Sequence, residues 1–388
     1  MSIRGKAHIA GAYEHPDRKI PDKSIAQVHA EVAVGALKDA GLTTSDVDAY
    51  FCAGDAPGFG PISMADYLGL KNLRHVDSTE TGGASYLTHV GHAAAAIATG
   101  KCRVALITLA GLPRSRPARR AGRSEAAPEA GFETVFGPTM VSMYALAARR
   151  HMHEFGTTSA QLAAIKVAAS LHAQYNPNAV LPTPVTIEEV LDSPMISDPL
   201  HRLDCCVITD GGGALVVVAP EVARDLPRQT VKVLGHGESP KLAGGGRIDL
   251  ARTGAVWSGP RAFEEAGVTQ ADIDYASIYD SFTITVLQTI EDLGFCDKGG
   301  GGAFVADGAL LAPHGRLPFN TDGGGLCNNH PANRGGMTKV IEAVRQLRGE
   351  ATAAVQVPDC ELVLAHGNGG SLGTRSAAAT LILGREDT

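Results

Sequence analysis

The sequence predicts an α/β protein built from two similar halves. The stretch "ALKDAGLTTSDVDAYFCAGD" at 36–55 is matched without gaps by "AFEEAGVTQADIDYASIYDS" at 262–281, which places Gly41 on Gly267. Apolar runs such as "VALITLA" and "ALVVVA" are typical of strands that are covered on both faces. An internal repeat combined with buried strands indicates two α/β halves that pack against each other.

Each copy of the repeat predicts the same local structure. A helix ends at a C-cap glycine, a short turn places Thr or Ser ahead of two aspartates, and an apolar strand comes next. The continuations also correspond, because "GGASYLTHVGHAAAAIATGKCRVALITLAG" predicts a helix, a glycine stop and a strand, and "NRGGMTKVIEAVRQLRGEA" followed by "CELVLAHGNGG" repeats that order. We therefore expect an N-terminal half at about 1–225 and a C-terminal half at 226–388.

The first half contains an insertion at about 112–195. It begins with the Pro/Gly/Arg-rich loop "GLPRSRPARRAGRSEAAPEAG" and continues with helical sequence such as "MVSMYALAARRHMHEFG". Insertions of this length tend to carry substrate contacts. The loop holds a basic cluster that suits phosphate groups, although a solvated mobile loop is an equally good interpretation; its members are Arg114, Arg116, Arg119, Arg120 and Arg123.

Composition excludes several classes of function. The formal net charge of -7 over 388 residues gives no reason to expect nucleic acid or a membrane surface as partner. No apolar run approaches the ~18 residues of a spanning helix, and the N-terminus lacks a cleavable signal, so we expect a cytoplasmic protein. The seven cysteines include no C-x-x-C pair and predict reduced thiols. His89 and His92 share a helix face without a third ligand, so no metal site is expected.

Four further stretches resemble the thiolase superfamily, specifically its sterol-carrier-protein-x-like branch. They occur in the family's order and span most of the chain: "SPMISDPLHRLDCCVITDGGGALVVV" (193–218), "YDSFTITVLQTIEDLGFC" (279–296), "FNTDGGGLCNNHPANRGG" (319–336) and "LAHGNGGSLG" (364–373). The resemblance implies a duplicated thiolase-like fold, with its two halves in α-β-α-β-α layers.

The departures from the family pattern carry most of the functional information. Counting back from the helix-ending Gly100 places the thiolase nucleophile at Gly83, and no cysteine occurs anywhere from 53 to 101. The branch's His-Asp-Cys-Phe motif is replaced by "YDSF" at 279–282. Both thiols expected of a Claisen-condensing thiolase are therefore missing. The family's His-Pro is retained at His330, where the preceding glycine of the family has become asparagine.

Retro-aldol cleavage beside a thioester needs no nucleophile. It needs one acid/base group and hydrogen-bond donors that hold the thioester enolate. The chain resembles the steroid side-chain aldolases, and this resemblance implies cleavage of a β-hydroxyacyl-CoA, with a steroid side-chain CoA ester as a candidate, to a ketone or aldehyde plus a shorter acyl-CoA. Coenzyme A enters as part of the substrate, and no covalently bound cofactor is expected.

Five residues form the expected catalytic set. Tyr279 stands where thiolases keep a His or Asn, and its phenol can exchange a proton if neighbouring donors lower its pKa from ~10. His330 binds the thioester oxygen or holds the base, and His366 is either a further donor or a structural histidine. Asp280 and Ser281 make the same strand end polar. Which of Tyr279, His330 and His366 is the base stays open.

The expected substrate and CoA contacts come from the glycine-rich segments and the arginine loop. Ser85, among them, is interpreted as a helix cap or polar turn residue more than as a nucleophile, because no activating base is evident. The expected contacts are Gly83, Ser85, Arg114, Arg116, Gly324, Gly369 and Gly370.

Two alternative functions stay open at this point. One is an acyl-CoA acyltransferase that uses Ser85 or Cys327 as a nonstandard nucleophile. The other is a non-catalytic thiolase-like subunit that binds acyl-CoA and scaffolds a partner. The resemblance also implies a homodimer with a small OB-fold partner protein of the DUF35 type.

Overall fold

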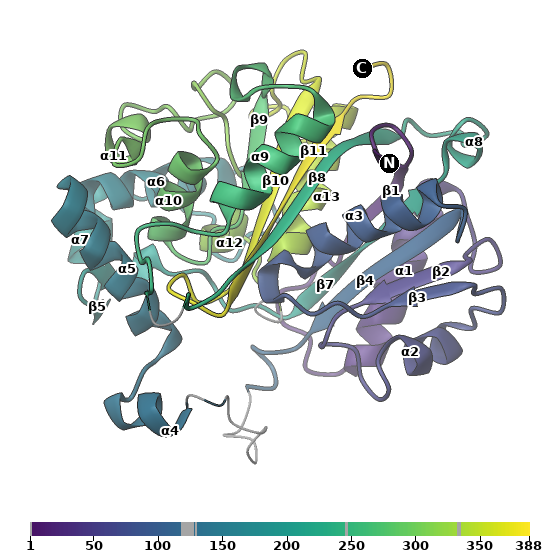
Figure 1. Cartoon of the computed structure of the whole chain (residues 1–388), viewed down its shortest axis with the longest axis horizontal. Coiled ribbons are helices and arrows are strands. Elements are labelled where there is room, and N and C mark those ends of the chain that lie inside the picture. Colours follow the sequence, from purple (N-terminus) through teal and green to yellow (C-terminus); the bar gives the residue numbers. More distant parts are fainter. Residues whose placement is uncertain (1, 118–127, 129, 245–246, 332–334) are drawn as a thin grey trace.

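The computed structural model describes residues 2–117, 128, 130–244, 247–331 and 335–388. Its centre is a nine-stranded sheet in the order β3-β2-β4-β7-β1-β8-β11-β10-β9 (Figure 1). A short hairpin, β5-β6, lies outside it. The strands are β1 (His8–Glu14), β2 (Ala49–Cys52), β3 (His75–Asp77), β4 (Val104–Gly111), β5 (Met195–Ser197), β6 (Leu200–His201), β7 (Gly211–Val218), β8 (Val231–Lys241), β9 (Tyr275–Ile278), β10 (Leu362–Gly370) and β11 (Ser376–Gly384).

The strand pairing confirms the predicted duplication. In the first half, β2 runs parallel to β4, and β4-β7 and β7-β1 are antiparallel. In the second half, β9 runs parallel to β10, and β10-β11 and β11-β8 are antiparallel. The same order is thus built twice, and the two copies join where β1 pairs with β8. The expected boundary near 225 falls in the connection before β8.

The helices complete the expected layers. Alternate residues of β4 enter different cores: Ile107 packs with α3 and α13 in the central core, whereas Leu106 packs with α1 in an outer core. Residues of β10 alternate in the same way between the central core and the outer core around α9 and α10. The layer-forming helices are α1 (Ile25–Ala40), α2 (Pro61–Leu68), α3 (Ser85–Ala98), α9 (Ala255–Ala266), α10 (Thr283–Asp292) and α13 (Gly336–Arg348).

The repeated residues end a helix and begin a strand in each half. Gly41 and Gly267 both adopt the left-handed conformation at a helix C-terminus, with φ of 72° and 66°. Asp48 accepts the N–H groups that begin β4, and Asp274 accepts those that begin β10. The equal spacing of these residues in the two copies therefore fixes where each equivalent strand starts.

The insertion of the first half packs on the second half. Helices α5 and α6 contact α10, while the segment around α4 projects from the body (Figure 1). Arg119, Arg120 and Arg123 lie outside the described residues. The remaining helical segments are α4 (Ala130–Glu133), α5 (Met140–Phe155), α6 (Ser159–Ala173), α7 (Ile187–Asp192), α8 (Pro220–Ala223), α11 (Gly301–Phe304), α12 (Gly324–Cys327) and the 3-10 turns η1 (Gly82–Ala84), η2 (Thr134–Phe136), η3 (Arg202–Asp204) and η4 (Gln270–Asp272).

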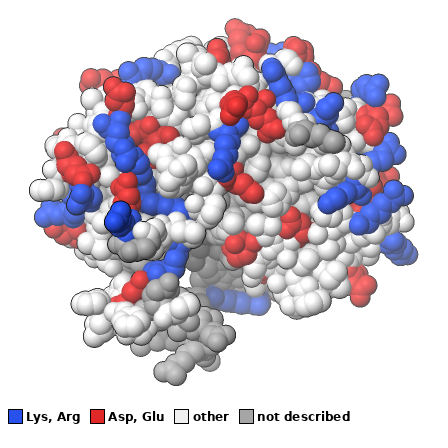
Figure 2. Space-filling model, viewed as in Figure 1, with Lys and Arg blue, Asp and Glu red and all other residues white. Residues whose placement is uncertain are grey.

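The surface mixes charges of both signs. On the face shown in Figure 2, Lys and Arg side chains alternate with Asp and Glu, and no extended basic area is visible. Among the helices that the structure describes, none combines the length and apolar character needed to cross a bilayer.

Candidate active site

Tyr279 and His330 form the centre of the site. Tyr279 comes directly after β9, where its N–H donates to the His366 carbonyl of β10 over 2.9 Å. The Tyr279 hydroxyl and the His330 Nε2 atom share a hydrogen bond of 2.8 Å. The His330 N–H donates to the hydroxyl of Thr209, which precedes β7. Four separate segments of the chain therefore bring these two buried side chains together.

Gly83 is packed against this pair. A Cβ atom added at Gly83 would lie 2.4 Å from Cε2 of Tyr279 and 2.3 Å from the Asn368 carbonyl oxygen. Such distances are far shorter than any real Cβ contact, and the Gly83 carbonyl is itself packed against Gly336 at the start of α13. The aromatic ring of Tyr279 thus fills the space that a side chain at position 83 would need.

Burial determines the protonation states at this centre. It raises the pKa of Tyr279 well above its ordinary value of 10, although a hydrogen bond with the Gly335 backbone opposes this shift. The condition that neighbouring donors lower this pKa is therefore not met, because the loss of solvent outweighs them. Burial also lowers the pKa of His330 to about 4, so its imidazole is neutral at pH 7, and its Nε2 accepts the Tyr279 proton in the tautomer that carries hydrogen on Nδ1.

Asp280 connects the Tyr279–His330 centre to the neighbouring helices. Its carboxylate accepts the N–H groups of Gly325 (2.8 Å) and Leu326 (3.1 Å) at the start of α12. It also forms an ion pair of 2.9 Å with Lys339 of α13, and both side chains are 1% exposed. This pair connects the end of β9 to the two segments on either side of His330. Asp280 therefore positions the site instead of facing a ligand, and Lys339 was not predicted from sequence.

Ser281 and His366 are the remaining polar residues expected at this site, and both form hydrogen bonds within the protein. Ser281 lies at the start of α10, where its hydroxyl is 3.1 Å from that of Thr285. His366 contacts the Thr380 hydroxyl through Nδ1 (3.0 Å). Burial lowers the pKa of His366 to about 3, so this imidazole is neutral.

A second tyrosine borders the site from the inserted helix α5. The Tyr144 hydroxyl donates to the Gly370 carbonyl (2.7 Å) and accepts from the Asn368 side chain (3.3 Å). Its spacing in the sequence gave no signal, because the contact depends on how the insertion folds back. Three buried atoms around this centre have no hydrogen-bond partner within the described ranges: His330 Nδ1, His366 Nε2 and Asn368 Oδ1.

The chain is similar to proteins of one family over nearly its whole length. Residues 241–385 match the thiolase C-terminal domain-like model. The chain is 35% identical to "Steroid side-chain-cleaving aldolase" of Thermomonospora curvata, with 99% of each chain covered. It is 34% identical to "17-hydroxy-3-oxo-4-pregnene-20-carboxyl-CoA lyase" of Mycobacterium tuberculosis, covering 98% of this chain and all of that protein. The chain belongs to the thiolase superfamily.

One further relative and two solved structures are also similar to the chain. An "Acetyl-CoA acetyltransferase" of Methanothermobacter thermautotrophicus is 34% identical, over 91% of this chain and 93% of that protein. The solved structure "Ltp2-ChsH2(DUF35) aldolase" has a TM-score of 0.88 and 33% identity, with 99% of each chain covered. Human mitochondrial 3-ketoacyl-CoA thiolase, at 13% identity and a TM-score of 0.72, supports the fold alone.

The two alternative nucleophiles expected from the sequence, Ser85 and Cys327, and the nearby thiol of Cys206 all lie in surroundings that disfavour a nucleophile. Ser85 is fully buried, and its hydroxyl accepts the Thr81 N–H (2.8 Å), which makes it a polar turn residue. Burial raises the pKa of the Cys327 thiol, which lies 3.1 Å from Lys166. Cys206, whose N–H donates to the Ser281 carbonyl, also has a pKa raised by burial.

The expected binding residues of the glycine segments serve close backbone packing. A Cβ at Gly324 would lie 2.1 Å from Asp280, one at Gly369 would lie 1.7 Å from the Thr81 carbonyl, and one at Gly370 would lie 2.1 Å from the Arg375 carbonyl. The structure places Arg114 and Arg116 elsewhere, with their guanidinium groups directed to backbone carbonyls of 18 and 23. Groups of His, Cys, Asp and Glu that could hold a metal are absent from the described part of the chain.

An apolar cavity of about 320 Å³ lies beside the segments that hold Tyr144 and Gly370. Met143 and Ser371 line it, and their chain neighbours Tyr144 and Gly370 belong to the site described above. Its walls are mainly hydrocarbon; besides those two residues it is lined by Glu133, Phe136, Pro138, Leu146, Ile248, Leu250, Gly373, Thr374 and Arg375.

Proposed function

We propose that this chain is a carbon-carbon lyase that cleaves a β-hydroxyacyl-CoA by a retro-aldol reaction, to a ketone or aldehyde plus a shorter acyl-CoA. One observation carries the proposal: the ring of Tyr279 fills the space beside Gly83, where a thiolase needs its nucleophile. The site retains an acid/base pair and has no room for an acyl-enzyme at this position. Two full-length relatives named as a lyase and an aldolase support the same reaction.

The Tyr279–His330 pair supplies the proton transfer. The proton of the substrate's β-hydroxyl passes to Tyr279 Oη while the phenol proton moves to His330 Nε2, 2.8 Å away. This relay avoids an isolated buried phenolate, which the raised pKa of Tyr279 makes unfavourable. Burial also disfavours the imidazolium that the relay forms, and the negative charges of Asp280 and of the developing enolate offset this cost. Tyr279 is thus the group that contacts the substrate, and His330 is the group that stores the proton.

Bond cleavage then needs only hydrogen-bond donors. As the oxygen forms a carbonyl, the electrons of the broken carbon-carbon bond pass to the α carbon and form the thioester enolate. The stored proton returns to that carbon and gives the shorter acyl-CoA, so the reaction is balanced without a co-reactant. We assign His366 Nε2 as a donor to the enolate oxygen, because this buried atom lacks a protein partner among the described residues and the ring is neutral.

The apolar cavity supports a large hydrocarbon as the acyl part of the substrate. Its volume of about 320 Å³ and its Phe, Pro, Met, Leu and Ile lining are suited to rings or to a branched chain. Relatives named for steroid substrates make a steroid side-chain CoA ester the first substrate to test. Binding of the CoA phosphates by Arg114 and Arg116 stays part of the proposal.

The proposed assembly is a homodimer with a DUF35-type OB-fold partner in the cytoplasm. The similar aldolase structure that names a DUF35 protein supports the partner. Exposed apolar side chains near the sheet edge at β3 support the dimer, since Phe59 is 81%, Ile62 52% and Tyr67 55% exposed. Light scattering of the chain alone and after co-expression with such a partner tests both parts.

Thiolase-type acyl transfer is the second candidate, because an acetyl-CoA acetyltransferase is among the full-length relatives. It would need a nucleophile other than position 83, and the thiols of Cys206 and Cys327 both have raised pKa values. A non-catalytic acyl-CoA-binding subunit is the third candidate, which unchanged activity of a complex after Tyr279→Phe would favour.

Product analysis by mass spectrometry separates these candidates. The chain, alone and with any co-purified partner, is incubated with a tertiary β-hydroxyacyl-CoA and separately with a β-ketoacyl-CoA plus free CoA. We expect ketone and shortened acyl-CoA from the first substrate and no thiolysis of the second. Thiolysis of the second substrate, or a trapped acyl-enzyme, would contradict the lyase and favour the acyltransferase.

A further inference from the structure

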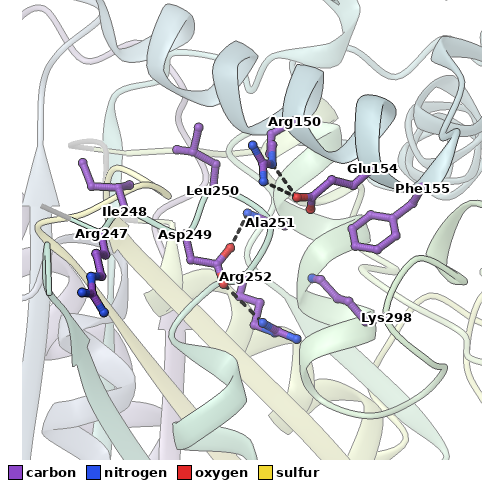
Figure 3. A pocket seen from close by; sticks show the side chains of 10 residues that line it. All are labelled: Arg150, Glu154, Phe155, Arg247, Ile248, Asp249, Leu250, Ala251, Arg252 and Lys298. Carbon is purple, nitrogen blue, oxygen red and sulfur yellow. Dashed lines mark hydrogen bonds and ion pairs between the residues drawn. The ribbon is translucent and has the colours of Figure 1, made fainter.

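A second cavity, of about 420 Å³, adjoins the apolar cavity and differs from it in charge (Figure 3). Ile248 and Leu250 line both cavities, so the two share one wall. The second cavity lies between the C-terminal end of α5 and the segment 247–252. Its remaining lining residues are Arg150, Glu154, Phe155, Arg247, Asp249, Ala251, Arg252 and Lys298.

One face of α5 runs along both cavities. Met143 and Leu146 line the apolar cavity, and Arg150 and Glu154 line the charged one. The intervals of three and four residues place all four side chains on the same side of the helix. At 1.5 Å per residue, this face is roughly 16 Å long. The two cavities are therefore successive parts of one groove. The groove is apolar beside Tyr144 and Gly370 and charged at the far end.

Three of the cations at the far end are paired with carboxylates of the protein. Arg150 is held by Glu154 (2.6 Å), and Arg252 by Asp249 (3.3 Å). Lys298 is held by Asp292 (2.8 Å). In Figure 3 Arg252 lies at the centre of the lining and Lys298 to its right, whereas Arg247 lies at the far left beside Ile248. A guanidinium keeps several donors free when it makes a single contact of this kind.

We propose that this groove holds the acyl part of the substrate and selects a bulky hydrocarbon that carries a carboxylate at the end remote from the thioester. This inference rests on the proposed lyase function and specifies its substrate class. The apolar stretch suits a hydrocarbon body, and Arg252 and Arg247 suit a terminal carboxylate, to which guanidinium groups bind in a planar, bidentate manner.

The apolar stretch also distinguishes the acyl group from the other half of the substrate. The pantetheine arm of CoA carries amides, which lose their hydrogen bonds to water when they are buried against hydrocarbon. Between the catalytic segments and the arginines, the groove offers mainly Phe136, Met143, Leu146 and Leu250. The CoA nucleotide is therefore a poor fit to this route, although its phosphates would also attract the arginines.

The test compares two β-hydroxyacyl-CoA substrates with the same carbon skeleton, one ending in a methyl group and one in a carboxylate. The measured quantity is kcat/KM for formation of the shortened acyl-CoA by the wild-type protein with its partner. We expect the carboxylate substrate to be preferred by at least about tenfold, a ratio equivalent to 1.4 kcal/mol. Equal values for the two substrates would overturn the inference.

Substitutions of single arginines show which residues cause the preference for the carboxylate substrate. Arg252→Gln, and separately Arg247→Gln, should lower the carboxylate-to-methyl ratio toward one, mainly through KM of the carboxylate substrate. Arg149→Gln is the matched control, since Arg149 lies on α5 beside Arg150, outside the lining of either cavity, and its ion pair with Asp198 is exposed. An unchanged ratio in both arginine variants would overturn the inference.

Two further outcomes separate this inference from its foundation. If the arginine variants alter discrimination between esters of CoA and of CoA lacking its 3′-phosphate, the charged end binds the nucleotide and the inference is wrong while the lyase stands. Cleavage of neither substrate, in the presence of the partner, would overturn the proposed function and this inference with it.

Discussion

The two halves of the molecule share a topology and differ in the residues that come directly after one equivalent strand. In the C-terminal half, β9 leads into Tyr279, whereas in the N-terminal half β2 leads into Ala53 at the equivalent position of the repeat. Asp55 takes the place of Ser281. Its carboxylate accepts the Tyr86 hydroxyl (2.6 Å) and the Ala110 N–H (3.0 Å).

Protein partners satisfy most of the N-terminal network, although His29 Nε2 also has no hydrogen-bond partner among the described residues. His29 lies 3.3 Å from Asp55 and bonds through Nδ1 to Thr108 (2.8 Å), which in turn contacts the Tyr50 hydroxyl (2.7 Å). The C-terminal site instead keeps buried atoms of His330, His366 and Asn368 without a partner in the ranges described. Buried polar groups are normally satisfied. The comparison indicates that the N-terminal copy uses the carboxylate after its strand within the protein, whereas the C-terminal copy places the Tyr279–His330 pair there.

The largest expected effect is the loss of activity in Tyr279→Phe. Removing the hydroxyl removes the proton relay to His330, and general acid/base catalysis contributes about 10²–10⁴-fold. We expect kcat to fall by this factor, measured by mass spectrometry of the products, while the unfolding midpoint changes little. A variant that retains wild-type kcat would remove Tyr279 from the mechanism and leave the two halves functionally alike.

Lys339→Met should have the largest effect on stability. It leaves Asp280 buried without its counter-ion, and breaking a buried pair costs about 3–5 kcal/mol. Urea unfolding measures this loss, and the double variant Asp280→Asn/Lys339→Met should recover part of it because the uncompensated charge is gone. If the single variant is as stable as the wild type, Asp280 does not depend on this ion pair and the support that we assign beneath Tyr279 is wrong.

Tyr86→Phe should affect the N-terminal network and leave catalysis intact. Loss of a hydrogen bond to a buried carboxylate costs about 1.5–3 kcal/mol. The Tyr86 hydroxyl donates to Asp55 and not to the Tyr279–His330 pair. The expected pattern is lower stability in urea with kcat/KM within about twofold of wild type. This pattern is the reverse of that expected for Tyr279→Phe, so an activity loss in Tyr86→Phe would contradict the division of roles between the halves.

Gly83→Cys tests whether the nucleophile can be restored. The new side chain collides with the Tyr279 ring, and overpacking costs about 1–3 kcal/mol. We expect lower stability, reduced lyase activity and no thiolysis of a β-ketoacyl-CoA. Gly131→Cys is a suitable control, because Gly131 of α4 does not have a left-handed φ and nothing lies within 4 Å of a Cβ added there. Thiolysis by Gly83→Cys would mean that the ring moves aside easily.

The sequence was sufficient for features that depend on local chemistry. Capping residues at fixed spacing predicted the duplication, and motif positions predicted Gly83, Tyr279 and His330 as parts of one centre. Lys339 was not predictable, because a lysine in a helical segment resembles an exposed polar residue until packing places it against Asp280. The direction of the Tyr279 pKa shift was not predictable for the same reason, since burial is a property of the assembled layers.

The smallest expected effect is on the pH dependence of stability, which should also differ between the halves. Burial lowers the pKa of His366 to about 3, so the unfolded chain binds its proton first and stability falls as pH drops from about 6.5. Hydrogen bonds to Asp77 and Glu238 raise the pKa of His92 to about 9, so its contribution to stability is present below about pH 6.5 and is lost as pH rises through 9.

His366→Gln should therefore flatten the acid side of the stability profile, by at most about 1.4 kcal/mol per pH unit, and His92→Gln should flatten the alkaline side. Urea unfolding between pH 4 and pH 9.5 measures both slopes, and a flattened alkaline side in His366→Gln would contradict the neutral imidazole on which its role as a donor depends.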